Sequence, residues 1–283
     1  VGLSSERLDR ITAHLRAEAA QGVIPGAVLM IARAGRIGYA EAVGFRDREA
    51  GAAMGFDAIF RIASMTKPIV SVAAMALAEE GRLDIGAPVA DYIPAFKELT
   101  VGAERAPARR TMTVQDLLRH TSGLTYAGFG DSPVQMIWRD ANLQDDDQTN
   151  DELVGKLARL PLMFEPGTTW EYSMSTDVLG RVVEIVAGQS LAGIVAERIT
   201  APLGMADTGF AAAGDKAARV AEPLVDKTTG KKPPMRNPAK PGRWQSGGGG
   251  LCGTAADYVR FCQMLLNGGQ LDGVRILDRK SVV

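Results

Sequence analysis

The segment that decides the fold reads Phe60-Arg61-Ile62-Ala63-Ser64-Met65-Thr66-Lys67-Pro68, and a run of apolar residues at helical spacing follows it. A serine hydroxyl is a poor nucleophile unless a neighbouring base takes its proton. If Ser64 opens a helix, Lys67 lies on the same face, with Cβ atoms about 5–6 Å apart. Burial or neighbouring charge must then keep the lysine amine partly neutral. The backbone N–H of Ser64 would face outward at the positive end of the helix, where it can stabilise an oxyanion.

A purely structural alternative is that Ser64 caps a helix whose first turn contains Lys67. Lysine is electrostatically unfavourable in a first turn, which argues against this alternative, whereas Pro68 fits such a turn. The tetrapeptide Ser-x-x-Lys is common by chance, so the rest of the chain has to supply the remaining evidence.

The overall composition excludes several classes of function. With 283 residues, 46% of them hydrophobic, the chain can fill one large domain or two. A formal net charge of −1 gives no reason to expect a nucleic-acid partner. The chain contains no stretch of about 18 apolar residues without a charge, so we do not expect a membrane span. We expect a cytoplasmic protein, or a periplasmic or secreted one if a signal peptide has been removed.

The two cysteines and two histidines limit the chemistry further. Cys252 and Cys262 do not have the spacing of a metal finger, and we expect neither a metal nor an organic cofactor. A Ser-His-Asp hydrolase needs a histidine after its nucleophile. We interpret His14 as a surface residue and His120 as the end of a short helix, so neither completes such a triad.

Apolar periodicity and capping residues predict the elements. We expect helices at residues 7–20, from Ser64 to about residue 80, and at 114–120, 176–187, 191–199 and 257–266. Residues 27–32 and 37–43 are expected to be strands joined by a tight turn at Ala34-Gly35. Residues 83–94 are interpreted as irregular and 211–242 as a surface excursion. The glycines at 247–250 indicate a bend or a close backbone approach.

The predicted fold class is α+β, with an antiparallel sheet flanked by helices and a mostly helical region. Residues 1–60 would form the first helix and strands, 61–210 the helical region with the candidate nucleophile, and 211–283 the excursion and the return to the sheet, together one catalytic unit. Two strands are too few for a stable sheet. Because residues 277–283 look like the start of a helix, we expect the chain to continue beyond Val283 and to supply further strands.

A second proton carrier is needed to protonate the leaving group, and Tyr172 is the candidate. It lies in Trp170-Glu171-Tyr172-Ser173-Met174, after the turn Glu165-Pro166-Gly167 and directly before a helix. A phenol with a free pKa near 10 acts as a base only when a cation favours its anion, and Lys67 can be that cation. The two groups would titrate as a pair, so neither is assigned as the sole base. A core or capping aromatic is the plainer interpretation of this residue alone.

Together these motifs resemble the serine β-lactamase and penicillin-binding-protein superfamily, and within it the family VIII carboxylesterases related to class C β-lactamases. The resemblance extends over the whole chain. It rests on Ser64-x-x-Lys67 within 60–91, Leu117-Leu118-Arg119-His120-Thr121-Ser122-Gly123-Leu124, Phe164-Glu165-Pro166-Gly167, Tyr172 to Gly188, Pro202-Leu203-Gly204-Met205, and Ser246 to Leu266.

The chain departs from the family pattern in two places. Class C β-lactamases have Tyr-x-Asn, whose amide binds the β-lactam side chain, and here Met174 replaces that Asn. This change favours esters over antibiotics. The third motif of the superfamily, Lys-Thr-Gly or its Trp-Gly-Gly-like substitute, is not found. Lys227-Thr228-Thr229-Gly230 is interrupted and is interpreted as a turn, so the third motif is expected beyond Val283.

A class A-like mechanism would instead use Ser122 as the proton-shuttling serine. The Asp-Asn that would follow it is absent, and its His-Thr-Ser-Gly context is that of a structural turn in class C-like proteins. Tyr172 is therefore preferred.

The resemblance implies a serine carboxylesterase that cleaves short-chain esters through an acyl-enzyme. It assigns Ser64, Lys67 and Tyr172 as catalytic residues, the Ser64 N–H to the oxyanion hole, and Tyr126, Met174 and Gly248 as substrate contacts. A small-molecule ester would be the partner, and the oligomeric state is not determined. A weak β-lactamase, a D-amino-acid peptidase and an acyltransferase remain open within the superfamily, and a non-catalytic peptidoglycan-binding protein outside its enzymes.

Overall fold

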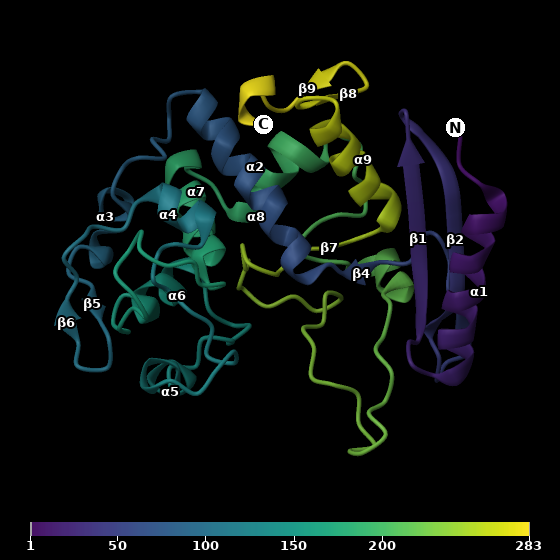
Figure 1. The fold of residues 1–283 in the computed structure, drawn as a ribbon, viewed down its shortest axis with the longest axis horizontal. Coiled ribbons are helices and arrows are strands. Elements are labelled where there is room, and N and C mark those ends of the chain that lie inside the picture. The colour runs from purple at the N-terminus through teal and green to yellow at the C-terminus, as the bar shows by residue number, and fades with distance from the viewer. Residues whose placement is uncertain (1, 283) are drawn as a thin grey trace. The chain divides into compact units, whose positions relative to one another are not determined.

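The computed structural model describes residues 2–282, which form two compact units (Figure 1). Unit 1 comprises Val1–Arg61, Thr200–Pro241 and Cys252–Arg275, and unit 2 comprises Ile62–Ile199, Gly242–Leu251 and Ile276–Val283. The units are therefore interleaved in sequence. The short segment Gly242–Leu251 belongs to the unit that contains Ser64, although most residues around it in sequence belong to the other.

Unit 1 is built around a three-stranded antiparallel sheet in the order β1-β2-β3, formed by Gly26–Arg33, Arg36–Asp47 and Ala52–Ala53. Helix α1, Ser5–Gln21, packs on β2, and α9, Ala255–Leu266, packs on β1. The tight turn between β1 and β2 is confirmed, since Ala34 and Gly35 have φ angles of 51° and 71°. Strand β3 was not predicted, because two residues carry no alternation.

The remaining elements of unit 1 are short. They are β4 (Phe60–Arg61), which pairs with β7 (Cys252–Gly253), the hairpin β8 (Gln270–Leu271) and β9 (Val274–Arg275), and a 3₁₀ turn at Gly214–Arg219. The predicted turn at residues 227–230 is confirmed, because Asp226 Oδ1 accepts from the N–H groups of Thr228 and Thr229 at 2.9 and 2.7 Å. The further strands expected beyond Val283 lie outside the described residues.

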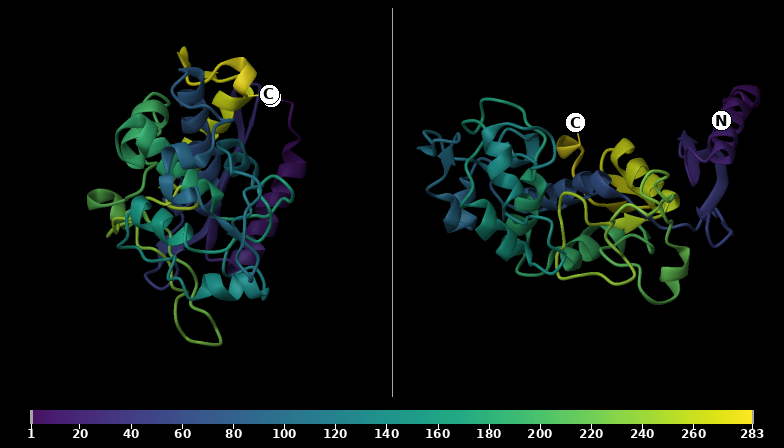
Figure 2. Two further views of the ribbon diagram at one scale, coloured as in Figure 1. Left: turned by 90° about the vertical axis from the view of Figure 1, so that its left-hand side faces the viewer. Right: turned by 90° about the horizontal axis from the view of Figure 1, so that it is seen from below.

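The regular elements of unit 2 are mainly helices; Figure 2 shows the chain in two further views. Its elements are α2 (Thr66–Glu79), α3 (Val89–Tyr92), β5 (Thr100–Val101), β6 (Ala106–Pro107), α4 (Val114–Arg119), α5 (Pro133–Arg139), α6 (Asn150–Leu157), α7 (Ser175–Ala187) and α8 (Leu191–Val195), with 3₁₀ turns at Ala63–Met65, Pro94–Phe96 and Arg279–Ser281 and a π turn at Ala196–Thr200. Helix α7 packs against α2, α3, α4, α6 and α8. Val178, Leu179, Val182 and Val183 on its apolar face are buried, so α7 is the central helix of this unit (Figure 1).

The helices that the sequence did not predict are short. Helices α5 and α6 were missed, and α3 lies in a segment interpreted as irregular. Their capping boxes, at Ser132 with Gln135 and at Thr149 with Glu152, are present in the sequence, but the helices have only 7 and 8 residues, which is too short for a clear helical periodicity. The helix predicted at residues 114–120 ends one residue earlier, at Arg119, because His120 has a φ of 55° and forms the C-cap of α4.

Membrane-spanning potential is limited in the described residues. No single helix among residues 2–282 is long and apolar enough to cross a membrane, and only α7 with Leu191–Thr200, a pair bent by 82°, has that length and composition.

Helix α4 is capped by a buried carboxylate that also holds the following turn. Asp116 has no exposed surface and accepts hydrogen bonds from Thr113 N and Oγ1, Arg110 and Thr121 Oγ1 at 2.7–3.0 Å. Burial acts to raise the pKa of Asp116, but the hydrogen bonds from Thr113, Arg110 and Thr121 outweigh it, and the pKa is lowered. The carboxylate therefore links the start of α4 to the turn that precedes the site.

We predict that Asp116→Ala lowers the free energy of unfolding by about 2–4 kcal/mol, because it leaves several buried donors unpaired. Glu152→Ala removes the corresponding acid of the exposed capping box at α6 and should cost much less. Denaturant unfolding of both variants measures this order, and equal losses would contradict the assignment. Since folding lowers the pKa of Asp116, its contribution is fully present above about pH 3.8 and is lost as the pH falls further.

Candidate active site

Ser64 lies in the 3₁₀ turn Ala63–Met65 that leads into α2, not in the α-helix itself. The expectation that Ser64 opens the helix is corrected in this detail, since α2 begins at Thr66. The reason is Ala63, whose φ of 44° places a non-glycine residue in the left-handed region directly before Ser64. Such strain is maintained only by its surroundings and is frequent at functional sites. The result is an exposed Ser64 beside a buried Lys67.

The predicted contact between Lys67 and Ser64 is present. The Lys67 Nζ donates to Ser64 Oγ at 3.3 Å, to Tyr126 Oη at 3.2 Å and to the carbonyl oxygen of Gly248 at 2.7 Å. An ammonium has three N–H donors, and here each has an acceptor. Lys67 is only 8% exposed, so these contacts replace the water that it has lost.

Tyr172 meets Ser64 from the other side. Its hydroxyl donates to Ser64 Oγ at 2.6 Å, and Lys67 Nζ lies 4.6 Å from the centroid of its ring. Burial acts to raise the pKa of Tyr172, but the Lys67 ammonium and the Ser64 hydroxyl outweigh it, and the pKa is lowered. The three residues that the motifs singled out are thus brought together around one oxygen atom.

The backbone N–H of Ser64 belongs to the first turn of a helical segment. The first N–H groups of such a segment have no intrahelical acceptor, so this donor can face an oxyanion next to Ser64 Oγ. A second oxyanion donor is not identified among residues 2–282.

Tyr126 contacts Lys67 and the ring of Tyr172. Its Oη accepts from Lys67, and its ring centroid is 5.5 Å from that of Tyr172. Burial, followed by the charges of Asp177 and Tyr172, raises the pKa of Tyr126 well above its usual value. Tyr126 is therefore a neutral phenol that helps to hold Lys67. A contact of Tyr126 with a substrate would have to be made while its hydroxyl is bound to Lys67.

The other two expected substrate contacts have a different environment. Met174 is 1% exposed, and its side chain is one of the largest that are fully buried, so it does not line an open surface. Gly248 is also buried, with its N–H on Asp177 and its carbonyl oxygen on Lys67. Neither residue offers substrate a free group here. The sequence pattern could not show this, because a motif match gives the position of a residue in the chain and not its burial.

Sequence reasoning missed Asp177 and Ser246, which lie close behind Lys67. The Ser246 hydroxyl donates to Asp177 Oδ1 at 2.5 Å, and Asp177 is 1% exposed. Asp177 lies in the first turn of a helix, where an acidic residue is usually explained by the helix dipole, so there was no separate reason in the sequence to assign it to the site. Its position on the apolar face of α7, directly before Val178 and Leu179, was the available signal.

His120 and Ser122 have structural partners. His120 Nδ1 accepts from the Ser173 N–H at 3.3 Å, and its ring centroid lies 5.0 Å from that of Tyr172. Burial and then the charge of Lys67 lower the pKa of His120 to about 4, so it is neutral. The Ser122 hydroxyl is buried and lies 2.7 Å from Ser175 Oγ. The structure gives neither side chain a hydrogen bond to Ser64.

Among residues 2–282 no group of three or more His, Cys, Asp or Glu side chains is placed to hold a metal ion. The site described here consists of a serine, a lysine and a tyrosine, with a backbone N–H.

Comparisons with known proteins place this site in a family. Residues 8–281 match the Beta-lactamase family. The chain is 39% identical over 267 residues to Esterase EstB of Burkholderia gladioli, covering 85% of this chain and 65% of that protein. It is 36% identical over 285 residues to Protein Rv1367c of Mycobacterium tuberculosis, covering 97% of this chain and 70% of that protein.

Solved structures agree with this assignment. The structure of EstCE1, described as a hydrolase with promiscuous acyltransferase activity, has a TM-score of 0.82 at 27% identity, covering 97% of this chain and 75% of that one. These findings confirm the fold class and the superfamily that the motifs indicated. With a family match over nearly its whole length, and with Ser64, Lys67 and Tyr172 in contact, the chain belongs to the Beta-lactamase family.

Proposed function

We propose that the protein is a serine hydrolase that cleaves short-chain carboxylic esters through an acyl-enzyme. The observation that carries this proposal is the convergence of Lys67 Nζ and Tyr172 Oη on Ser64 Oγ, at 3.3 and 2.6 Å. A nucleophile with an adjacent base, and a second group within hydrogen-bond reach, is the arrangement that acyl transfer requires.

Before Ser64 can attack the ester, either Lys67 or Tyr172 has to lose one proton. Both Lys67 and Tyr172 donate to Ser64 Oγ, so loss of one proton from the pair turns one of them into an acceptor. That acceptor takes the Ser64 proton as Oγ attacks the ester carbonyl. The lowered pKa of Tyr172 favours this state, and the Ser64 N–H stabilises the tetrahedral oxyanion.

The second step returns the proton. Tyr172 is half-buried, whereas Lys67 is enclosed by protein acceptors, so Tyr172 is the group that can reach a departing alcohol. After the alcohol leaves, water attacks the acyl carbonyl and the same pair accepts its proton. The bond between the acyl carbon and Ser64 Oγ then breaks, Oγ takes that proton back, and the acyl group leaves as a carboxylic acid.

Aromatic rings around Tyr172 support an apolar acyl or alcohol group. The ring centroids of His120, Tyr126, Phe129 and Trp170 lie 5.0–6.4 Å from that of Tyr172. Phe129 and Trp170 are 67% and 65% exposed. The likeness to Esterase EstB supports an ester as the substrate. Transfer of the acyl group to an alcohol instead of water is the second candidate, which the described activity of EstCE1 supports.

We predict that Ser64→Ala abolishes esterase activity while the protein stays folded. Loss of a covalent nucleophile lowers the rate by orders of magnitude. The matched control is Ser190→Ala, which removes the N-cap hydroxyl of α8 and should cost about 1 kcal/mol of stability without loss of turnover. Hydrolysis of p-nitrophenyl butyrate and labelling with a fluorophosphonate probe, located by peptide mass spectrometry, measure both. Near-normal turnover in folded Ser64→Ala would remove Ser64 from the mechanism.

Lys67→Arg should be nearly as inactive as Lys67→Ala. A guanidinium stays protonated, and its planar fork cannot reproduce the contacts of Lys67 Nζ with Ser64 and Gly248. Lys156→Arg, a change at a surface lysine that binds the Asn142 carbonyl oxygen and Gln148, serves as the control and should retain activity. If Lys67→Arg keeps most of the wild-type kcat, Lys67 acts as a fixed charge and Tyr172 alone transfers the proton.

The substrate class is tested by comparing esters with a β-lactam. We expect p-nitrophenyl esters with acyl chains of about two to six carbons to be hydrolysed much faster than nitrocefin. Met174, which stands where class C β-lactamases have the Asn that binds the β-lactam side chain, is buried and offers the substrate no amide. A kcat/KM for nitrocefin equal to that for p-nitrophenyl butyrate would overturn the ester assignment and leave the acyl-enzyme mechanism in place.

A further inference from the structure

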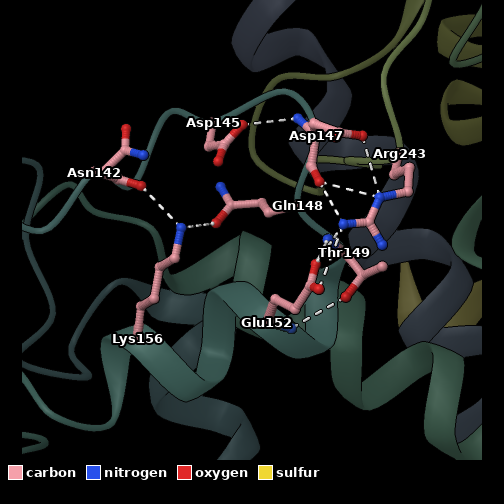
Figure 3. A network of polar contacts seen from close by, with 8 residues as sticks. All are labelled: Asn142, Asp145, Asp147, Gln148, Thr149, Glu152, Lys156 and Arg243. Carbon is pink, nitrogen blue, oxygen red and sulfur yellow. Dashed lines mark hydrogen bonds and ion pairs between the residues drawn. The ribbon is translucent and has the colours of Figure 1, made fainter.

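The segment Gly242–Leu251, which we call the strap, is held at both ends within unit 2. At its start, Arg243 donates to the carbonyl oxygen of Asp147 at 2.6 Å and forms ion pairs with Asp147 and Glu152 (Figure 3). At its end, the Leu251 N–H donates to Thr66 Oγ1 at 3.1 Å, one residue before Lys67. Both anchors fix the course of the backbone between them.

Asp177 holds the middle of the strap. Its Oδ1 accepts from the Ser246 hydroxyl at 2.5 Å and from the Gly248 N–H at 3.0 Å. Two glycines allow this approach: a Cβ on Gly247 would lie 2.4 Å from the Thr176 carbonyl oxygen, and one on Gly248 would lie 2.4 Å from Asp177 Oδ2. Of the bend or close backbone approach predicted for residues 247–250, the close approach is present at Gly247 and Gly248.

The strap also binds Lys67. The carbonyl oxygen of Gly248 accepts from Lys67 Nζ at 2.7 Å, the shortest of the three contacts of that nitrogen. The same residue that donates its N–H to Asp177 therefore fixes the lysine that faces Ser64. Displacing Gly248 would move Nζ away from Ser64 Oγ, and small displacements of catalytic groups are costly.

Asp177 also brings a buried negative charge to the site. The charged or titratable groups that act on it are Lys67 from α2, and Tyr126 and Tyr172 from the loops before α5 and α7. Burial raises the pKa of Asp177, and the hydrogen bonds from Ser246 and Gly248 and the charge of Lys67 offset only part of this rise. Buried charges persist when they are paired and hydrogen-bonded, and Lys67 supplies the opposite sign.

We propose that Asp177 is a positioning residue: its ionised carboxylate holds Ser246 and Gly248 so that the Gly248 carbonyl fixes Lys67, and its charge balances the Lys67 ammonium. This inference rests on the proposed function, since it concerns the proton transfer at Ser64. It makes Asp177 act through Gly248 and Lys67, without contact to the substrate.

The test is Asp177→Asn, which keeps the shape and one acceptor oxygen but removes the charge. We expect kcat for p-nitrophenyl butyrate to fall about tenfold or more with KM nearly unchanged, because the lysine is misplaced. Removing a negative charge disfavours the protonated state of the Lys67–Tyr172 pair. The acidic limb of the kcat/KM profile should therefore move to lower pH. A merely structural role would not move this limb.

Two variants serve as comparisons. Asp151→Asn removes an exposed carboxylate that pairs with Arg181, and it should change neither kcat nor the pH profile. Ser246→Ala removes one hydrogen bond to Asp177 but keeps its charge, so kcat should fall about threefold or more while the acidic limb stays in place. Thermal unfolding of each variant verifies that it is folded.

The outcomes separate this inference from the proposed function. If the wild-type protein neither hydrolyses esters nor is labelled at Ser64 by a fluorophosphonate, the proposed function fails whatever Asp177 does. If the wild type is active and folded Asp177→Asn keeps its kcat and acidic limb, the positioning role is overturned. If Asp177→Asn does not fold, Ser246→Ala decides: an unchanged kcat overturns the role, and a reduced kcat at constant KM supports it.

Discussion

The burial of the Lys67 ammonium is the constraint on which the site depends. A lysine amine in the protein interior must replace the water it loses, and Lys67 does so with three acceptors from three segments of unit 2: Ser64, Tyr126 and Gly248. Each contact restrains the segment that provides it. The position of Ser64 relative to Tyr172 therefore follows from how the lysine is satisfied.

Several locally unfavourable features are gathered around this lysine. Ala63 has a left-handed backbone, Asp177 is a buried carboxylate, and the strap approaches α7 so closely that a Cβ at Gly247 or Gly248 would collide with it. Strained and buried polar groups of this kind are kept where surrounding structure over-determines them. The buried apolar face of α7 is the main such support, since it packs against α2 and α4.

The chemistry of the reaction and the choice of substrate depend on different residues of the site. Membership of the Beta-lactamase family and the contacts of Ser64 speak for acyl transfer, which Tyr172 and Lys67 can assist on a serine. The choice between ester and β-lactam depends on the groups that face the substrate. Met174 was expected to be one of them, yet its side chain is in the core. Rings with exposed faces, such as Trp170 and Phe129, are better placed to contact a substrate.

The sequence by itself identified Ser64, Lys67 and Tyr172 as the candidate nucleophile, lysine and tyrosine, because Ser64 and Lys67 are three residues apart at the start of a helical segment and Tyr172 belongs to a recognisable motif. It also predicted α7 and the β1–β2 hairpin, whose periodicity and turn residues are local signals. The short helices α5 and α6 lacked such periodicity and were missed. Only the tertiary structure decided that Met174 is buried and that Asp177, Ser246 and Gly248 lie behind Lys67. These contacts join residues about 70 to 180 positions apart, and no local pattern encodes them.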